Sequence, residues 1–284
     1  MAHSAMQADR EARSWREGPA AGALSRSCAD TKAAPRAALS IALREPLNQR
    51  KHMAPPRIID PKAIPVAGVD AHLPAVDAER LTAPALQQRF AQALSWEPEH
   101  PGDGGRFLSD RGPAEAAVLV PLVQRPHGLQ VLLTRRTDHL RDHAGQISFP
   151  GGRSEEHDDG PAGTALRETH EEVGLAPERV RVIGQMPPYT TVTHFVVTPV
   201  VGLVQPPFEL TLDTFEVAEA FEVPLLYLMN PAHHRRHVFT FDGGQRQFLS
   251  MPWHGPGGDG VEREYFIWGA TAAMLRNLYR FLAE

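Results

Sequence analysis

Three glutamates, Glu168, Glu171 and Glu172, are the residues whose type and spacing most clearly indicate chemistry. They stand at positions i, i+3 and i+4 of a segment predicted to be helical, 160–173, so their side chains share one helix face. A cluster of hard oxygen ligands suits Mg²⁺ or Mn²⁺, whose charge would offset the repulsion between the carboxylates. Taken alone, the three glutamates fit a solvated acidic helix face better than a metal site.

A basic segment precedes this helix. A predicted strand delivers Arg135 and Arg136 into a loop that also contains His139, Arg141 and His143. The planar guanidinium of arginine matches phosphate oxygens, so this segment is suited to hold a phosphate group beside a bound cation. Arginines facing solvent at a strand end are the alternative interpretation.

The acidic segment resembles the Nudix box, written G-x5-E-x7-R-E-U-x-E-E-x-G-U with U a bulky apolar residue. The second half of the pattern matches at every charged position, with Arg167, Glu168, Glu171, Glu172, Gly174 and Leu175 in place. The first half departs from it. Asp159 stands where the box has its first glutamate, which leaves a helix cap as an equal interpretation of that residue. Arg153 stands where the box has its opening glycine, and Thr169 is less apolar than usual.

The resemblance implies a set of roles. Glu168 and Glu172 would be the principal metal ligands, Glu171 would assist, and Arg167 would orient a glutamate by a charge-assisted hydrogen bond. A metal-activated water would attack one phosphorus of a pyrophosphate. The implied fold is an α/β fold, or α+β, in the form of an α/β/α sandwich around a mixed central β-sheet.

The segment from Leu132 to Gly152 is similar to the signature of the coenzyme A pyrophosphatase branch, L-L-T-x-R-(S/A)-x3-R-x3-G-x3-F-P-G-G, with Thr137 as the one mismatch. The similarity extends over about residues 118–279. It implies hydrolysis of coenzyme A or a derivative to 3′,5′-ADP and 4′-phosphopantetheine or its acyl form. It also implies that Arg135, Arg136, Arg141, Gly151 and Gly152 contact substrate. The alternatives are another nucleoside diphosphate substrate, such as ADP-ribose or a dinucleotide, and a non-catalytic binding module of the same fold. The intact glutamate set disfavours the binding module.

Other residues give weaker signals. Glu216 is a candidate late carboxylate that binds metal or activates water, although a surface glutamate on a short helix, 216–221, is the plainer interpretation. His233, His234 and His237 have the residue type of a zinc cluster but fall in a predicted loop between strands. Tyr265, Phe266 and Trp268 are interpreted as core residues.

Hydrophobic periodicity and turn residues predict the remaining elements. Thr82 is predicted to cap a helix over 83–94, and 55–74 shows no clear pattern. Strands are predicted at 116–123, 129–134, 147–149, 180–186, 195–204, 238–241 and 247–251, and a last helix at 270–282.

Composition limits the class of protein. The 284 residues are 42% hydrophobic and 22% charged, with a net charge of −5, which disfavours nucleic acid as a partner. No apolar run approaches the roughly 20 residues that cross a membrane, and the single cysteine, Cys28, favours the cytoplasm. We expect a disordered tail, a targeting peptide or a mis-assigned start at 1–52, a linker plus helix at 53–113, and the hydrolase domain at 114–284. The oligomeric state is left open.

Overall fold

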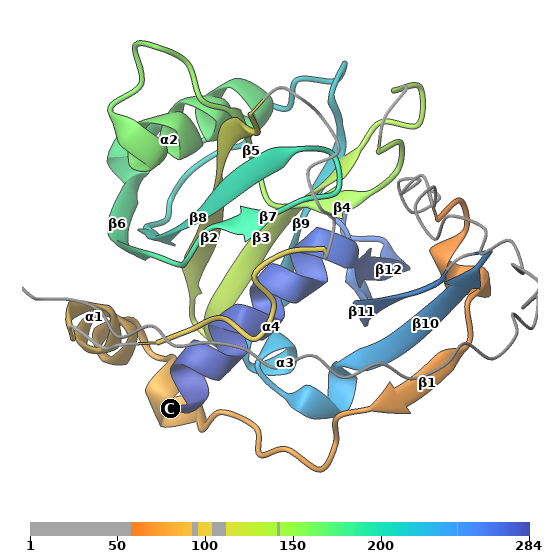
Figure 1. Ribbon diagram of the computed structural model, residues 1–284. Coiled ribbons are helices and arrows are strands. Elements are labelled where there is room, and N and C mark those ends of the chain that lie inside the picture. Colours follow the sequence, from red (N-terminus) through yellow and green to blue (C-terminus); the bar gives the residue numbers. More distant parts are fainter. Residues whose placement is uncertain (1–57, 93–95, 104–111, 141–142, 243) are drawn as a thin grey trace, which may run out of the picture. The chain divides into compact units, whose positions relative to one another are not determined.

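The strands of the computed structural model form two β-sheets in the part of the chain that is described, residues 58–92, 96–103, 112–140, 143–242 and 244–284 (Figure 1). Residues 51–284 make one compact unit. No helix in the described residues has the length and apolar character needed to cross a membrane.

The larger sheet is mixed. Its centre is β2 (Ala114–Arg125), which runs parallel to β8 (Phe195–Val204) and is buried on both faces, as parallel strands usually are. A hairpin connects β2 to β3 (Gly128–Arg136), with Gly128 at a φ of 111° in the turn. The strand order is β4-β3-β2-β8-β6, and β5, β7 and β9 pair with β2, β8 and β3 respectively. The strands of this sheet not yet given bounds are β4 (Ile147–Ser148), β5 (Gly151–Arg153), β6 (Val180–Gln185), β7 (Tyr189–Thr190) and β9 (Val217–Pro224).

Helices cover both faces of this sheet. Helix α2 (Gly160–Val173) packs through Ala165 and Val173 on one face. Helix α4 (Gly269–Ala283) lies over the other face (Figure 1). It contributes Leu275 and Leu278 to the core. The predicted α/β/α sandwich with a mixed central sheet is therefore confirmed.

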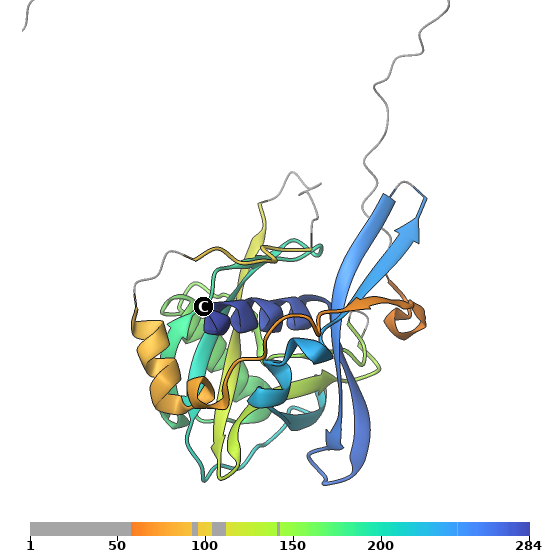
Figure 2. The same ribbon diagram turned by 90° about the horizontal axis from the view of Figure 1, so that it is seen from below.

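The second sheet has the order β1-β10-β11-β12 and is antiparallel, and Figure 2 shows its long β10–β11 hairpin. Its strands are β1 (Val66–Val69), β10 (Arg235–Phe241), β11 (Gly244–Pro256) and β12 (Glu262–Trp268). The sequence predicted β10 and β11 but neither β1 nor β12. Strand β1 is a short edge strand with little apolar alternation. Its pairing with β10 comes from residues about 170 positions away, which local pattern cannot report.

The first described residues, 58–91, include elements that pack on helix α4 near the C-terminus. A 3₁₀ turn (Pro61–Ala63), β1, a second 3₁₀ turn (Ala78–Leu81) and α1 (Ala83–Ala91) follow one another. The Thr82 hydroxyl accepts a hydrogen bond from the Ala85 amide, which confirms the predicted cap. Leu86 of α1 is fully buried, and Arg89 donates to the Phe281 carbonyl of α4. The segment preceding the predicted hydrolase domain thus contributes to the same core.

One predicted element is wrong. The helix expected at 216–221 is replaced by strand β9, which pairs antiparallel with β3. Val217, Phe221 and Val223 are buried at odd positions, the period of a strand. Alanine and glutamate favour a helix locally, but pairing with β3 and burial of these apolar side chains outweigh that small preference. Three short turns complete the fold: 3₁₀ turns at Pro177–Arg179 and Pro231–His233, and α3 (Leu225–Leu228).

Candidate active site

Helix α2 carries the three glutamates as the spacing predicted, but it exposes them unequally. Glu171 is exposed, Glu168 is half-buried, and only 6% of Glu172 is exposed. The helix ends at Gly174, whose left-handed φ of 70° allows its amide to donate to the His170 carbonyl. Thr169, the unusual residue of the motif, is buried, and its hydroxyl donates to the Ala165 carbonyl at 2.6 Å. The face of α2 that turns towards the sheet therefore holds Glu172 most deeply.

Two glycines of β5 make room for the carboxylates. The Gly151 amide donates a hydrogen bond to Glu172 Oε2 at 3.1 Å. A Cβ atom on Gly152 would lie 2.4 Å from Glu168 Oε2, and a Cβ on Gly151 would lie 2.4 Å from the Ala117 carbonyl oxygen. Only glycines allow β5 to approach both β2 and the acidic face of α2 this closely.

Arg167 holds the acidic segment together. Its Nε donates to Asp158 Oδ1 at 2.8 Å, and its Nη1 donates to Glu168 Oε1 at 3.0 Å and to Glu171 Oε2 at 3.1 Å. Hydrogen bonds from Arg167 hold the pKa of the Asp158 carboxyl well below its usual range. The geometry accords with the orienting role implied for Arg167.

Asp158 is a site residue that the sequence did not indicate. Its carboxylate also accepts from the Thr164 hydroxyl and the Glu155 amide, so it anchors the loop before α2. Asp159, which occupies the motif position, stands at the helix N-cap but makes no side-chain capping hydrogen bond. The only sequence signal for Asp158 is its adjacency to that position.

Arg136 connects the acidic helix to β9. Its Nη1 lies 3.5 Å from Glu172 Oε1, and its Nη2 lies 3.4 Å from Glu216 Oε2. Glu216 immediately precedes β9 and is partly exposed. The structure therefore brings together a late carboxylate and an arginine, both named from the sequence, beside the most buried glutamate.

The surroundings of Glu172 and Glu168 disfavour the negatively charged form of each carboxyl group. Burial raises the pKa of the Glu172 carboxyl to about 7, and the neighbouring Glu216 and Glu168 carboxylates raise it too, against the Gly151 amide and Arg136, which lower it. Burial also raises the pKa of Glu168. A buried carboxylate that ionises at such cost is stabilised when a cation is supplied.

The donor set fits a divalent cation in its chemistry. Glu168 and Glu172 offer hard carboxylate oxygens at positions where burial raises the pKa of each. The Glu168 carboxylate, which is paired with Arg167, further raises the pKa of Glu172. In the described part of the chain, no three His, Cys, Asp or Glu side chains already converge as a ligand set. Arg167 and the Gly151 amide occupy oxygens of Glu168 and Glu172 instead.

The two neighbouring arginines of β3 face opposite sides of the sheet. Arg136 faces α2, whereas Arg135 Nε lies 3.5 Å from Glu219 Oε2, and Arg135 Nη1 lies 3.7 Å from Asp138. Glu219 is buried and was not singled out from the sequence, because a glutamate in a predicted surface helix carries no such signal. Of the other basic residues named above, His139 packs on the Phe215 ring and His143 contacts Gln146; Arg141 lies outside the described residues.

The three histidines near β10 have structural contacts. The buried His234 contacts the Leu228 carbonyl through Nε2 and Arg276 through Nδ1. His237 contacts the Ile64 carbonyl and the Ser250 hydroxyl, and His233 stacks on Tyr227. These contacts connect the three histidines to the packing around β10. Tyr265 is buried as expected for a core residue, and Phe266 and Trp268 are half-buried.

Sequence comparisons relate the chain to one family. The NUDIX domain family matches residues 113–241. The Escherichia coli O7:K1 protein named uncharacterized Nudix hydrolase NudL is 41% identical over 166 residues, which cover 58% of this chain and 80% of that protein. A Salmonella dublin protein of the same name is 40% identical over 205 residues, covering 72% of this chain and 96% of that protein.

Structural comparison gives weaker likenesses. A crystal structure of a Caenorhabditis elegans Ap4A hydrolase binary complex aligns with 39% of this chain and 80% of its own, at 19% sequence identity and a TM-score of 0.33. At that TM-score the likeness supports no statement about substrate. The acidic helix, the glycine pair, Arg135, Arg136 and Arg167 all lie within the matched residues 113–241.

Proposed function

Because this chain belongs to the Nudix hydrolase family, we propose that its pyrophosphatase site acts on coenzyme A or a coenzyme A derivative, with Mg²⁺ or Mn²⁺ as its cation. The enzyme is a pyrophosphohydrolase of nucleotide derivatives, in a family that uses divalent metals. The substrate and the identity of the metal are the proposed part.

One observation carries the substrate proposal. The segment from Leu132 to Gly152 is similar to the coenzyme A pyrophosphatase signature, and two of its residues contact Glu172 of the acidic helix. Arg136 from this segment contacts Glu172 and Glu216, and the Gly151 amide donates to Glu172. Two residues of this segment, Arg136 and Gly151, therefore contact Glu172, one of the carboxylates proposed to bind the cation, which supports the substrate proposal.

Each residue of the site has a separate proposed role. Glu168 and Glu172 would hold the cation, with Glu171 assisting; when bound, the cation supplies charge neutralisation and water activation at the pyrophosphate. Arg167 fixes the orientation of the Glu168 carboxylate, and the Gly151 amide fixes that of Glu172. Arg136 places a guanidinium where it can donate to a phosphate oxygen, because its ion pairs of 3.4 and 3.5 Å are loose. Glu216, which pairs with the same Arg136, would accept a proton from the attacking water.

Two alternatives remain distinct from this proposal. A Nudix hydrolase for ADP-ribose or a dinucleotide would use the same carboxylates with a different substrate pocket. A non-catalytic binding module would have no need for a carboxylate whose pKa burial raises to about 7. That energetic cost favours an enzyme over a binding module.

A substrate panel tests the proposal. The purified protein with Mg²⁺ or Mn²⁺ is assayed against coenzyme A, acetyl-coenzyme A, oxidised coenzyme A, 3′-dephospho-coenzyme A, ADP-ribose and NADH. Coenzyme A should give 3′,5′-ADP and 4′-phosphopantetheine. A lost charge-assisted hydrogen bond to the 3′-phosphate costs roughly ten- to a hundred-fold in kcat/KM, so 3′-dephospho-coenzyme A and ADP-ribose should be poorer by about that factor. Equal or higher kcat/KM on ADP-ribose would overturn the substrate proposal but not the family chemistry.

We also propose a cytoplasmic location, which the single cysteine favours. The segment 1–52 lies outside the described residues. Its composition, rich in Ala, Arg and Ser without an apolar period, supports the proposal that catalysis does not depend on it.

A further inference from the structure

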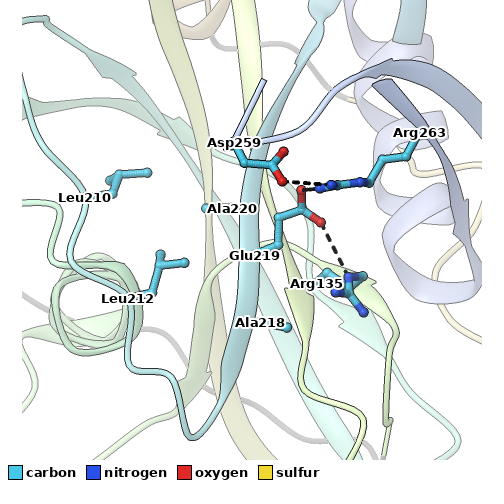
Figure 3. Close-up of a pocket in the computed structure, with 9 residues that line it drawn as sticks. Arg135, Leu210, Leu212, Ala218, Glu219, Ala220, Asp259 and Arg263 are labelled. Carbon is cyan, nitrogen blue, oxygen red and sulfur yellow. Dashed lines mark hydrogen bonds and ion pairs between the residues drawn. The ribbon is translucent and has the colours of Figure 1, made fainter. Parts of the chain in front are cut away.

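A pocket of about 710 Å³ lies beside strand β9, close to the candidate active site (Figure 3). Within the described part of the chain, β9 pairs with β3 alone, so its other edge is free to line this pocket. The segment 208–213 lies along one side, and the connection between β11 and β12 closes the other. Gly258 of that connection approaches so closely that a Cβ atom there would lie 2.5 Å from the Ala220 carbonyl oxygen.

One wall of the pocket is apolar. Leu210 and Leu212 are half-buried, and the small side chains of Ala218 and Ala220 on β9 leave space in front of them. Figure 3 shows the two leucines on the opposite side of the pocket from the charged residues. An apolar wall of this kind is suited to contact short aliphatic groups of a ligand.

The other wall is polar but has no net charge. Glu219 accepts hydrogen bonds from Arg263 and from the Tyr265 hydroxyl, and Arg263 also donates to Asp259 at 2.8 Å. Arg135 completes the set, 3.5 Å from Glu219 Oε2. Two guanidiniums thus face two carboxylates. A phosphate would have to displace a carboxylate from each arginine, so the pocket is better suited to a neutral ligand.

This polar wall still offers an acceptor. Only 7% of Glu219 is exposed, and its Oε2 has no hydrogen-bond partner among the described residues; the 3.5 Å contact with Arg135 lacks hydrogen-bond geometry. A buried carboxylate oxygen without a donor is costly unless a ligand supplies one. Gly258 covers the edge of β9 at the Ala220 carbonyl, but no other strand of the described residues pairs with that edge at Ala218, where backbone groups are of the kind that pair with extended amide chains.

The pocket begins where the catalytic carboxylates end. Ala218 follows Glu216 by two residues, about 7 Å along a strand. Arg135 precedes Arg136, which contacts Glu172. A substrate whose pyrophosphate lies beside Glu172 and Glu216 would reach the pocket around the edge of β9, because Arg135 and Glu219 lie on the sheet face opposite to α2.

Resting on the proposed function, we infer that this pocket holds the pantetheine arm of the substrate. That arm is an uncharged chain of two amides separated by short aliphatic groups. Its amide N–H groups match Glu219 Oε2 and the edge of β9, and its methyl and methylene groups match Leu210 and Leu212. The pocket would therefore bind the pantetheine half of the substrate, and the site beside Glu172 and Glu216 would bind its phosphates.

The test fills the pocket without touching the catalytic carboxylates. Ala218 is exposed on an edge strand, so Ala218→Trp should be accommodated and should occupy the pocket. Val182→Trp, at an exposed position of β6 outside the pocket, is the matched control. Leu212→Ser is a second variant, used if the tryptophan at 218 lowers the melting temperature. Binding of D-pantetheine in EDTA is measured by NMR chemical-shift perturbation, and KM and kcat for coenzyme A are measured with Mg²⁺.

Wild type and Val182→Trp should bind pantetheine, whereas Ala218→Trp and Leu212→Ser should bind it at least about ten-fold more weakly. The two pocket variants should also show a matching rise in KM for coenzyme A, with little change in kcat. If wild type hydrolyses coenzyme A but the pocket variants keep its KM and its pantetheine binding, the pocket assignment is wrong and the proposed function stands. If wild type does not hydrolyse coenzyme A, the proposed function fails, and the pocket assignment fails with it.

Discussion

Replacing Glu172 by glutamine should stabilise the metal-free protein while it abolishes most catalysis. Glutamine is nearly isosteric with glutamate and can still accept the hydrogen bond from the Gly151 amide. It removes the negative charge that burial and the neighbouring Glu216 and Glu168 disfavour. A residue kept for function at the expense of stability is expected to behave in this way.

The size of the effect follows from the pKa. Burial raises the pKa of Glu172 from its ordinary value of 4.5 to about 7, which corresponds to roughly 3 kcal/mol. Because the folded-state pKa is above the unfolded one, protonated Glu172 stabilises the folded state relative to the charged form. That stability is present below pH 4.5 and is lost as the pH rises through about 7. Glutamine mimics the protonated form, so its advantage should be small at pH 4.5 and complete at pH 8.

Melting in EDTA measures this advantage. At pH 8, Glu172→Gln should melt about 6–12 °C higher than wild type, and at pH 4.5 the difference should shrink to about 1–2 °C. Glu171→Gln, an exposed position on the same helix, is the matched control and should melt like wild type. With saturating Mg²⁺, the kcat of Glu172→Gln should fall by about a hundred-fold or more. An unchanged or lower melting temperature at pH 8 in EDTA would refute the reasoning, because it would mean that the buried charge carries no cost.

Three further outcomes follow from local geometry. Gly152→Ala should lower kcat about ten-fold or more, because its Cβ would displace the Glu168 carboxylate, while Gly112→Ala, which meets no atom within 4 Å, should leave kcat unchanged. Arg276→Leu should lower the melting temperature by about 6–12 °C at unchanged kcat, because it leaves the buried Asp70 carboxylate, 3.0 Å from Arg276 Nη1, without its ion-pair partner. A drop below about 2 °C would show that this ion pair contributes little to stability. Removal of residues 1–52 should leave kcat/KM and the melting temperature as they are in the full chain, and a loss of several degrees in calorimetry would contradict that expectation.

The sequence alone was sufficient for the acidic helix. Its bounds, 160–173, and its end at Gly174 agree with the structure, because a proline in the first turn and a glycine in the left-handed conformation act through neighbouring residues. The shared face of Glu168 and Glu172 likewise follows from helical spacing. Their assignment as metal ligands remains a prediction that the variants above test.

Only the tertiary structure decided the element that follows Glu216. The segment has helix-forming residues, yet it pairs with β3, which lies about 80 residues earlier in the chain. That pairing places Glu219 opposite Arg135 and creates a free sheet edge beside the active site. No local pattern contains this information, because a strand is stabilised by its partner and by burial of alternate side chains.

Tertiary structure also separated two arginines that the sequence treated alike. Arg135 and Arg136 are adjacent in β3, so their side chains project from opposite faces of the sheet. Arg136 reaches Glu172 and Glu216 on the face covered by α2, and Arg135 reaches Glu219 on the other. Residue type and order indicated a phosphate-binding segment. Which guanidinium lies beside the catalytic carboxylates depended on which face of the sheet α2 covers, and that is settled by packing across the whole domain.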